Sequence, residues 1–208
     1  MPRASARNKL KAGDAAPVHP RAGVLDASMR LFSRHGFSGT TMRDIAQDVG
    51  ILPGSLYAHI SSKDELLFEI VESGIDKFLS IGLRKDVTTG TPEQRMRAAI
   101  KAHVEVVAEN PERTLVVFHQ WRYLEGPHLK QAIEKRLRYQ QVFDRIFEDG
   151  VKGGSFSTSV EQHIAIFTIL GALNWTPEWY SPKGPLKADE IGDLVADVLL
   201  RGLVRSKR

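Results

Sequence analysis

Between residues 41 and 63 the chain carries side chains that donate hydrogen bonds, namely Thr41, Arg43, Ser55, Tyr57, His59 and Lys63. Donors of these types bind phosphate oxygens, and an arginine fork also fits the O6 and N7 acceptors of guanine in the DNA major groove. The seven His form no H-E-x-x-H or paired-histidine metal spacing, and neither a Walker loop nor a G-x-S-x-G motif occurs. We therefore expect nucleic-acid binding rather than enzymatic catalysis, with no metal site and no cofactor.

The distribution of charge supports this interpretation. Residues 1–63 contain nine Lys or Arg and four Asp, whereas the whole 208-residue chain contains 29 Lys or Arg and 25 Asp or Glu. The net charge of +4 therefore originates in the first third of the sequence. A local positive surplus is typical of a segment that binds a polyanion.

The composition excludes several other classes of protein. With 42% apolar and 26% charged residues, the chain resembles an ordinary folded domain rather than a disordered one. The absence of Cys rules out disulfides, thiolate nucleophiles and Cys-rich zinc sites. Neither a signal-peptide core nor an apolar stretch long enough for a membrane span is visible. We expect a cytoplasmic protein that does not enter the membrane.

Short helices must position the donor side chains. Apolar residues recur at helical spacing over residues 21–35, 42–49 and 53–60. Gly36 and Gly50 end the first two helices, a threonine at position 40 or 41 caps the second, and Pro53 opens the third. Two short helices joined by a glycine-containing turn in a basic region indicate a helix-turn-helix, whose second helix enters the major groove.

The remaining sequence is helical as well, with helices predicted over about residues 61–83, 93–109, 112–124, 127–151, 160–179 and 188–204. No strand-like alternation of useful length occurs, so we predict an all-α fold with an N-terminal three-helix domain and a C-terminal helical domain. Residues 1–20 are predicted to be a disordered basic arm, residues 21–66 the DNA-binding domain and residues 67–208 the second domain. The arm is expected to attract DNA diffusely, and insertion into a minor groove is the alternative.

The stretch from Gly36 to Leu67 closely resembles the DNA-binding domain of the tetracycline-repressor (TetR/AcrR) family of bacterial transcription regulators. The resemblance implies that Thr41, Tyr57, His59 and Lys63 hold phosphates. Arg43 and Ser55 are the candidates for direct base readout, while Leu52, Pro53 and Gly54 approach the groove closely. Taken singly, Tyr57 is also compatible with packing in the small domain. Two positions depart from the family pattern: Leu52 replaces a Ser or Thr cap, and Ile60 replaces an aromatic core residue.

The same resemblance implies that residues 67–208 bind a small effector and form a dimer. The segment from Gly171 to Gly184 resembles a subgroup that regulates fatty-acid or sterol degradation and responds to acyl-coenzyme A thioesters. The candidate ligand-binding residues are Phe118, His119, Arg122, Gln140, Asn174, Trp175, Trp179 and Tyr180. Arg122, Arg136, Arg138 and Lys183 are candidate cations for phosphates or a carboxylate. Aromatic residues at this spacing are more often part of a core or interface than of a ligand site, and a charge run such as that around Arg136 is usually a solvated face.

A homodimer is expected because one recognition helix covers only a half-site of the DNA. The helices over 160–179 and 188–204, with Gly171 and Ala172 permitting close approach, form the predicted interface. The predicted function is a homodimeric repressor that a small effector releases from a double-stranded DNA operator. The alternative is a helical DNA-binding adaptor or packaging protein without an effector.

Overall fold

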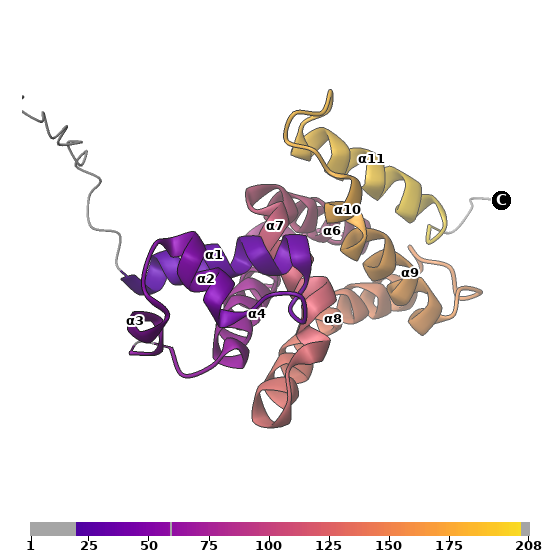
Figure 1. Cartoon of the computed structure of the whole chain (residues 1–208). Coiled ribbons are helices and arrows are strands. Elements are labelled where there is room, and N and C mark those ends of the chain that lie inside the picture. Colours follow the sequence, from indigo (N-terminus) through magenta and orange to yellow (C-terminus); the bar gives the residue numbers. More distant parts are fainter. Residues whose placement is uncertain (1–19, 59, 205–208) are drawn as a thin grey trace, which may run out of the picture.

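The computed structural model describes residues 20–58 and 60–204. The α-helices are α1 (Pro20–His35), α2 (Met42–Val49), α3 (Pro53–Tyr57), α4 (Lys63–Ile81), α5 (Lys85–Thr88), α6 (Pro92–Glu109), α7 (Pro111–Leu115), α8 (Gly126–Lys152), α9 (Gln162–Asn174), α10 (Thr176–Trp179) and α11 (Ala188–Arg201). A π-helix, η1 (Val116–Gln120), and a 3-10 helix, η2 (Trp121–Tyr123), connect α7 with α8 (Figure 1). Within the described residues the only β-structure is one bridge between Phe156 and Val204, so the predicted all-α class is confirmed.

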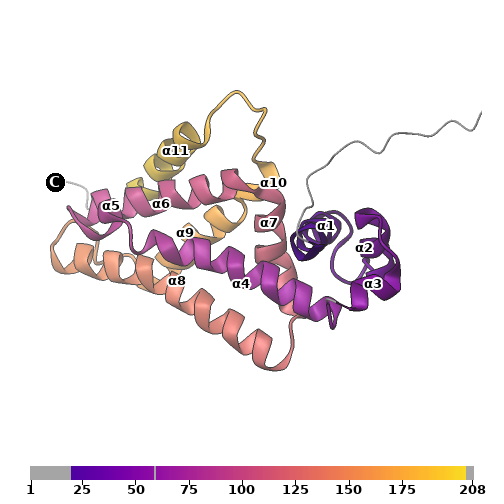
Figure 2. The same ribbon diagram turned by 90° about the vertical axis from the view of Figure 1, so that its left-hand side faces the viewer.

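Helices α1, α2 and α3 gather at one end of the molecule, and α4 leads from them into the other helices (Figure 2). We call α1–α3 with the start of α4 the N-terminal bundle, and the remaining helices the body. Phe32, Ile45, Leu56 and Leu66 are fully buried and join the four helices of the bundle. Ile60 is 1% exposed, which confirms that it is a core substitution for the family's aromatic residue.

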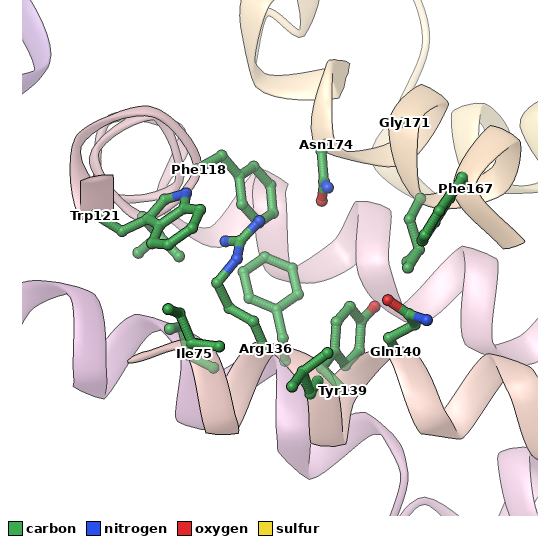
Figure 3. Close-up of a pocket in the computed structure, with 14 residues that line it drawn as sticks. Ile75, Phe118, Trp121, Arg136, Tyr139, Gln140, Phe167, Gly171 and Asn174 are labelled. Atoms are coloured by element: carbon green, nitrogen blue, oxygen red, sulfur yellow. The ribbon is translucent and has the colours of Figure 1, made fainter. Parts of the chain in front are cut away.

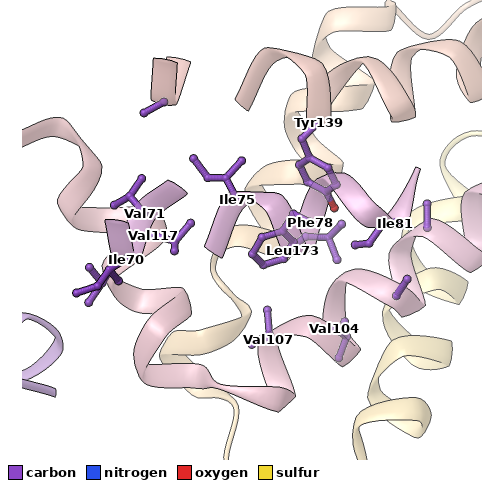
Figure 4. Packing of buried hydrophobic residues seen from close by; sticks show 14 of the residues in the cluster. Ile70, Val71, Ile75, Phe78, Ile81, Val104, Val107, Val117, Tyr139 and Leu173 are labelled. Atoms are coloured by element: carbon purple, nitrogen blue, oxygen red, sulfur yellow. The ribbon is translucent and has the colours of Figure 1, made fainter. Parts of the chain in front are cut away.

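The body is organised around α6, which packs against α4, α8 and α11. Figure 4 shows Phe78 of α4, Tyr139 of α8 and Leu173 of α9 converging beside Val104 and Val107 of α6. Burial of such large apolar side chains is the dominant favourable contribution to folding. None of the helices formed by the described residues combines the length and apolar character that a bilayer crossing requires.

Three predicted helices differ from the observed ones. The recognition helix ends at Tyr57 rather than near residue 60, and the segment predicted as one helix over 112–124 divides into α7, η1 and η2. The single helix predicted over 160–179 is wrong, because α9 ends at Asn174 and a separate turn, α10, follows Trp175. Pro177 accounts for this break, since proline lacks the N–H of a continuing helix and its ring clashes with the carbonyl four residues earlier.

Two further predictions concern residues that the structure does not describe. The basic arm lies outside the described residues except for Pro20, which begins α1. His59, a predicted phosphate contact, also lies outside them.

Candidate nucleic-acid interface and ligand cavity

Local hydrogen bonds set the angle between α2 and α3. Thr41 caps α2 in a reciprocal capping box: its hydroxyl oxygen accepts from the Asp44 N–H, and the Asp44 carboxylate accepts from the Thr41 N–H. Gly50 ends α2 with φ of +76°, a left-handed conformation that glycine adopts without penalty. The Ile51 N–H then donates to the Ala46 carbonyl at 3.0 Å. The turn between the helices is therefore specified by local sequence.

The start of α3 forms an exposed surface. Leu52 is 78% exposed and has no capping side chain, in agreement with its departure from the family pattern. Pro53, Gly54 and Ser55 are exposed as well, and a Cβ on Gly54 would meet nothing within 4 Å. Tyr57 is 58% exposed, so it does not pack within the bundle core. This surface is accessible to a large partner.

Two of the predicted contact residues lie at the start of α2: Thr41 is its cap and Arg43 is in its first turn. Arg43 is exposed and forms no ion pair with another described residue. The Thr41 hydroxyl donates a hydrogen bond to Asp44 Oδ2 at 2.7 Å, and the Thr41 backbone N–H donates a second one to the same oxygen. These two hydrogen bonds lower the pKa of the Asp44 carboxyl. A phosphate contact by Thr41 therefore requires that one of these hydrogen bonds be given up.

Lys63 has a structural role that the sequence did not reveal. Its ammonium donates to the carbonyl of Phe37 at 2.7 Å and to that of Thr40 at 2.8 Å. The ammonium also lies 4.1 Å from the centroid of the Phe37 ring, and burial lowers the pKa of Lys63. The side chain thus ties the start of α4 to the loop between α1 and α2.

The N-terminal bundle contacts the body through that same loop. Gly36 ends α1 with φ of +73°, and the next N–H, that of Phe37, donates to Gln120 Oε1 at 2.9 Å. The Phe37 ring also lies 5.6 Å, centroid to centroid, from that of Tyr123. Gln120 and Tyr123 belong to η1 and η2, so these two short helices face the bundle.

A cavity of about 420 Å³ lies in the body between α4, η1, α8 and α9 (Figure 3). Its lining is mostly apolar and aromatic, with a few polar groups, as is usual for small-molecule sites. The lining residues are Ile75, Phe78, Val117, Phe118, Trp121, Ile133, Arg136, Leu137, Tyr139, Gln140, Phe167, Leu170, Gly171 and Asn174. Leu137 and Phe167 are 51% and 57% exposed, so the cavity opens between α8 and α9.

Only some of the predicted ligand-binding residues meet at this cavity. Phe118, Gln140 and Asn174 line it, and so does Arg136, one of the four candidate cations. Figure 3 shows Asn174 reaching in from α9, opposite Arg136 and Tyr139 of α8. Sequence reasoning did not select Phe78, Trp121 or Tyr139, because each reads as an ordinary apolar position of its helix.

The other predicted ligand-binding residues do not line the cavity. His119 Nε2 lies 2.9 Å from Glu178 Oε1, which connects η1 to α10. Trp175 and Trp179 are 58% and 49% exposed. Arg122 is exposed and Tyr180 is partly buried against the core.

A buried polar pair joins Tyr139, which lines the cavity, to His103 of α6 behind it. His103 Nδ1 lies 2.8 Å from the hydroxyl of Tyr139, and the His103 ring is fully buried beside Phe78 and Phe118. Burial lowers the pKa of His103 to about 3 and raises that of Tyr139. Both side chains are therefore neutral near pH 7.

Two family models match the chain over separate regions. The model described as bacterial regulatory proteins, tetR family, matches residues 24–70. The model described as the tetracyclin repressor-like C-terminal domain matches residues 89–203.

Relatives match nearly the whole chain. The HTH-type transcriptional repressor KstR2 of Rhodococcus jostii is 30% identical over 193 residues, which cover 88% of this chain and 90% of that protein. The structure of the ketosteroid transcriptional regulator KstR2 of Mycobacterium tuberculosis has the same fold, with a TM-score of 0.82 at 22% identity over 92% of this chain and 98% of that one. AibR, solved with isovaleryl coenzyme A and operator DNA, has a TM-score of 0.76 at 26% identity over 86% of this chain and 96% of its own.

Proposed function

Because the chain belongs to the TetR family of bacterial regulatory proteins, we propose that it is a homodimeric transcriptional repressor that binds a pseudo-palindromic DNA operator and leaves it when a small effector binds. The observation that carries this proposal is the exposed start of α3, held at a fixed angle by the α2 cap and the Gly50 turn. Residues 21–66 are assigned to DNA binding and residues 67–208 to effector binding and dimerisation. Because α4 crosses that boundary, it connects the two activities mechanically.

We propose that α3 enters the major groove with Leu52, Pro53, Gly54 and Ser55 against the base edges. The free guanidinium of Arg43 fits a guanine, and the exposed Leu52 side chain fits a thymine methyl. Phosphates on either side of the groove are assigned to Thr41, Tyr57, His59 and Lys63. Lys63 has one ammonium proton left for this contact, since two others bind backbone carbonyls.

The proposed dimer interface is formed by α9 and α11. Ile164 and Phe167 of α9 and Leu194 and Val198 of α11 are each more than half exposed in the single chain. Gly171, which also lines the cavity, has nothing within 4 Å of where a Cβ would lie, so the proposed interface borders the cavity. Exposed apolar patches of this kind mark interaction surfaces, and a two-fold dimer buries the same patch of both chains.

Two elements reach from the cavity to the N-terminal bundle and support the proposed release mechanism. Helix α4 contributes Phe78 to the cavity and Leu66 to the bundle core. The η1–η2 segment contributes Phe118 to the cavity and accepts the Phe37 N–H through Gln120. A ligand that binds more tightly to the conformation in which these elements are displaced increases the population of that conformation. In it, the distance between the two α3 helices of the dimer no longer fits DNA.

Effector release separates this function from that of a helical adaptor or packaging protein. The cavity favours the repressor, because a protein without an effector needs no opening of about 420 Å³ lined by aromatic and polar groups. The proposed effector is an apolar molecule or an acyl thioester, and AibR, with isovaleryl coenzyme A in its structure, supports the second class.

The test begins by selecting bound sequences from a library of random DNA duplexes. We expect a consensus with two-fold symmetry, bound by two chains. The complex is then titrated with a panel of acyl-coenzyme A thioesters and uncharged apolar compounds, and at least one should release the DNA. If no consensus sequence emerges, the packaging protein is favoured. If a consensus emerges but no thioester releases the chain from it, the thioester is excluded as the effector and the assignment as a repressor stands.

A further inference from the structure

We propose that the cavity binds an apolar carboxylic acid whose free carboxylate pairs with Arg136. This inference rests on the proposed effector site and narrows its ligand to a chemical class. A thioester has no free carboxylate at its acyl carbon, so the proposal distinguishes the acid from its coenzyme A derivative.

Arg136 is a charge without a counter-charge. It is the one charged residue among those that line the cavity, and it forms no ion pair or hydrogen bond with another described residue. Its guanidinium lies 4.7 Å from the centroid of the Trp121 ring, so the ring face partly compensates the loss of water. An unpaired charge withdrawn from solvent is costly, and proteins normally pair it.

The protonation state of Arg136 is settled by its surroundings. Burial, together with the positive charge of Arg122, lowers the pKa of Arg136 to about 10. The guanidinium therefore stays charged at neutral pH. Tyr139, the other titratable residue that lines the cavity, is neutral, so no lining residue cancels this charge.

Other polar groups around the cavity also lack acceptors. The buried indole N–H of Trp121 has no hydrogen-bond partner among the described residues. The Asn174 amide, which reaches into the cavity from the facing helix, forms no hydrogen bond there with a described side chain or backbone group (Figure 3). A carboxylate accepts several hydrogen bonds and binds an arginine fork in bidentate fashion, so it satisfies the Arg136 guanidinium and the Asn174 amide better than an ester or an amide.

The rest of the cavity fits an apolar body rather than a nucleotide. Phe78, Phe118, Phe167 and Leu170 supply flat and branched apolar surface. Coenzyme A carries several phosphate charges, whereas the cavity offers a single guanidinium. One anionic group on a compact apolar body matches both the charge and the volume of about 420 Å³.

The test measures direct binding by calorimetry with the full chain and no DNA. The probes are saturated acids from octanoate to dodecanoate and one fused-ring carboxylic acid, each beside its methyl ester, and decanoyl-coenzyme A. We expect at least one acid to bind about tenfold or more tightly than its own ester. In Arg136→Met the acid should bind no better than the ester, while Arg136→Lys should keep part of the preference. Arg145→Met is the matched control, because Arg145 is exposed and lies on the same helix outside the cavity.

Several outcomes overturn the inference. The inference fails if no acid binds, or if the unmodified chain binds acid and ester equally well. It also fails if Arg136→Met still prefers the acid. A fourth contrary result is that decanoyl-coenzyme A binds more tightly than decanoate and that its binding does not depend on Arg136. Thermal unfolding of Arg136→Met checks that the variant is folded, which an apolar replacement of an unpaired charge should permit. Because no DNA is present, failure here is separate from failure of operator binding.

Discussion

Replacing Lys63 with methionine separates two roles of one side chain. The change removes two charge-assisted hydrogen bonds, to the carbonyls of Phe37 and Thr40, and the contact with the Phe37 ring. Each hydrogen bond to a charged group is worth about 1.5–3 kcal/mol, and partial exposure of the ammonium reduces that value. We therefore expect Lys63→Met to lower the free energy of unfolding by about 2–3 kcal/mol in total.

The same variant also tests the proposed phosphate contact. Loss of one phosphate contact should reduce the slope of log affinity against log salt by about 0.9. The matched control is Lys130→Met, because Lys130 is exposed and has no ion pair with a described residue. Urea unfolding gives the stability, and operator titrations over a range of salt concentrations give the slope.

The two measurements have separate outcomes. If Lys63→Met is as stable as Lys130→Met, the structural role of Lys63 is refuted. If it is destabilised but the salt slope is unchanged, Lys63 positions the loop between α1 and α2 and touches no phosphate.

Three further predictions follow from particular residues. Arg43→Ala should reduce the free energy of discrimination between bases by about 1–3 kcal/mol at the base pairs that Arg43 reads. Binding to operators with single-base changes measures this loss. Equal weakening of binding to every sequence contradicts base readout. Val198→Glu places a charge in the proposed α11 interface, so sedimentation should show a monomer in place of the dimer. A dimer that persists in this variant shows that other residues form the interface. Burial lowers the pKa of His103 to about 3 in the folded chain, against an ordinary value of 6.5, so the unfolded state takes up the proton first as pH falls. The chain should therefore lose about 2 kcal/mol between roughly pH 7.5 and pH 5 through this residue, and urea unfolding of His103→Gln should lack that loss; identical pH dependence of both proteins refutes the assignment.

The N-terminal bundle could be predicted largely from sequence because its signals are local. The Thr41 cap, the left-handed Gly50 and the first-turn Pro53 each act within a few residues, and α2 begins and ends where those residues predict. The two departures from the family pattern had their expected effects, since Leu52 caps nothing and Ile60 is buried.

The cavity could be predicted only in part, because it assembles from segments far apart in the chain. Phe118, Gln140 and Asn174 are among the ligand-binding residues predicted from the sequence, and they do line it. Trp175 and Trp179 do not line it: Trp175 caps the end of α9, Trp179 lies in the separate turn α10, and both rings are about half exposed.

Two roles depend on contacts across the fold that periodicity does not encode. Lys63 reaches carbonyls more than twenty positions earlier in the chain, whereas its type and place in the sequence predict only a phosphate contact. The Arg136 guanidinium stacks on Trp121 across the turn into α8, although its neighbours in sequence suggest a solvated charge run. Packing of α8 against η2, rather than any local pattern, withdraws this charge from water.

Methylation protection of guanine N7 shows whether α3 enters the major groove twice per dimer, because N7 lies in that groove. On a selected operator that contains guanines in both half-sites, we expect two protected patches about 10 base pairs apart, or a multiple of that spacing, on one face of the duplex. Protection of a single patch, or none while the minor groove is covered, would contradict it.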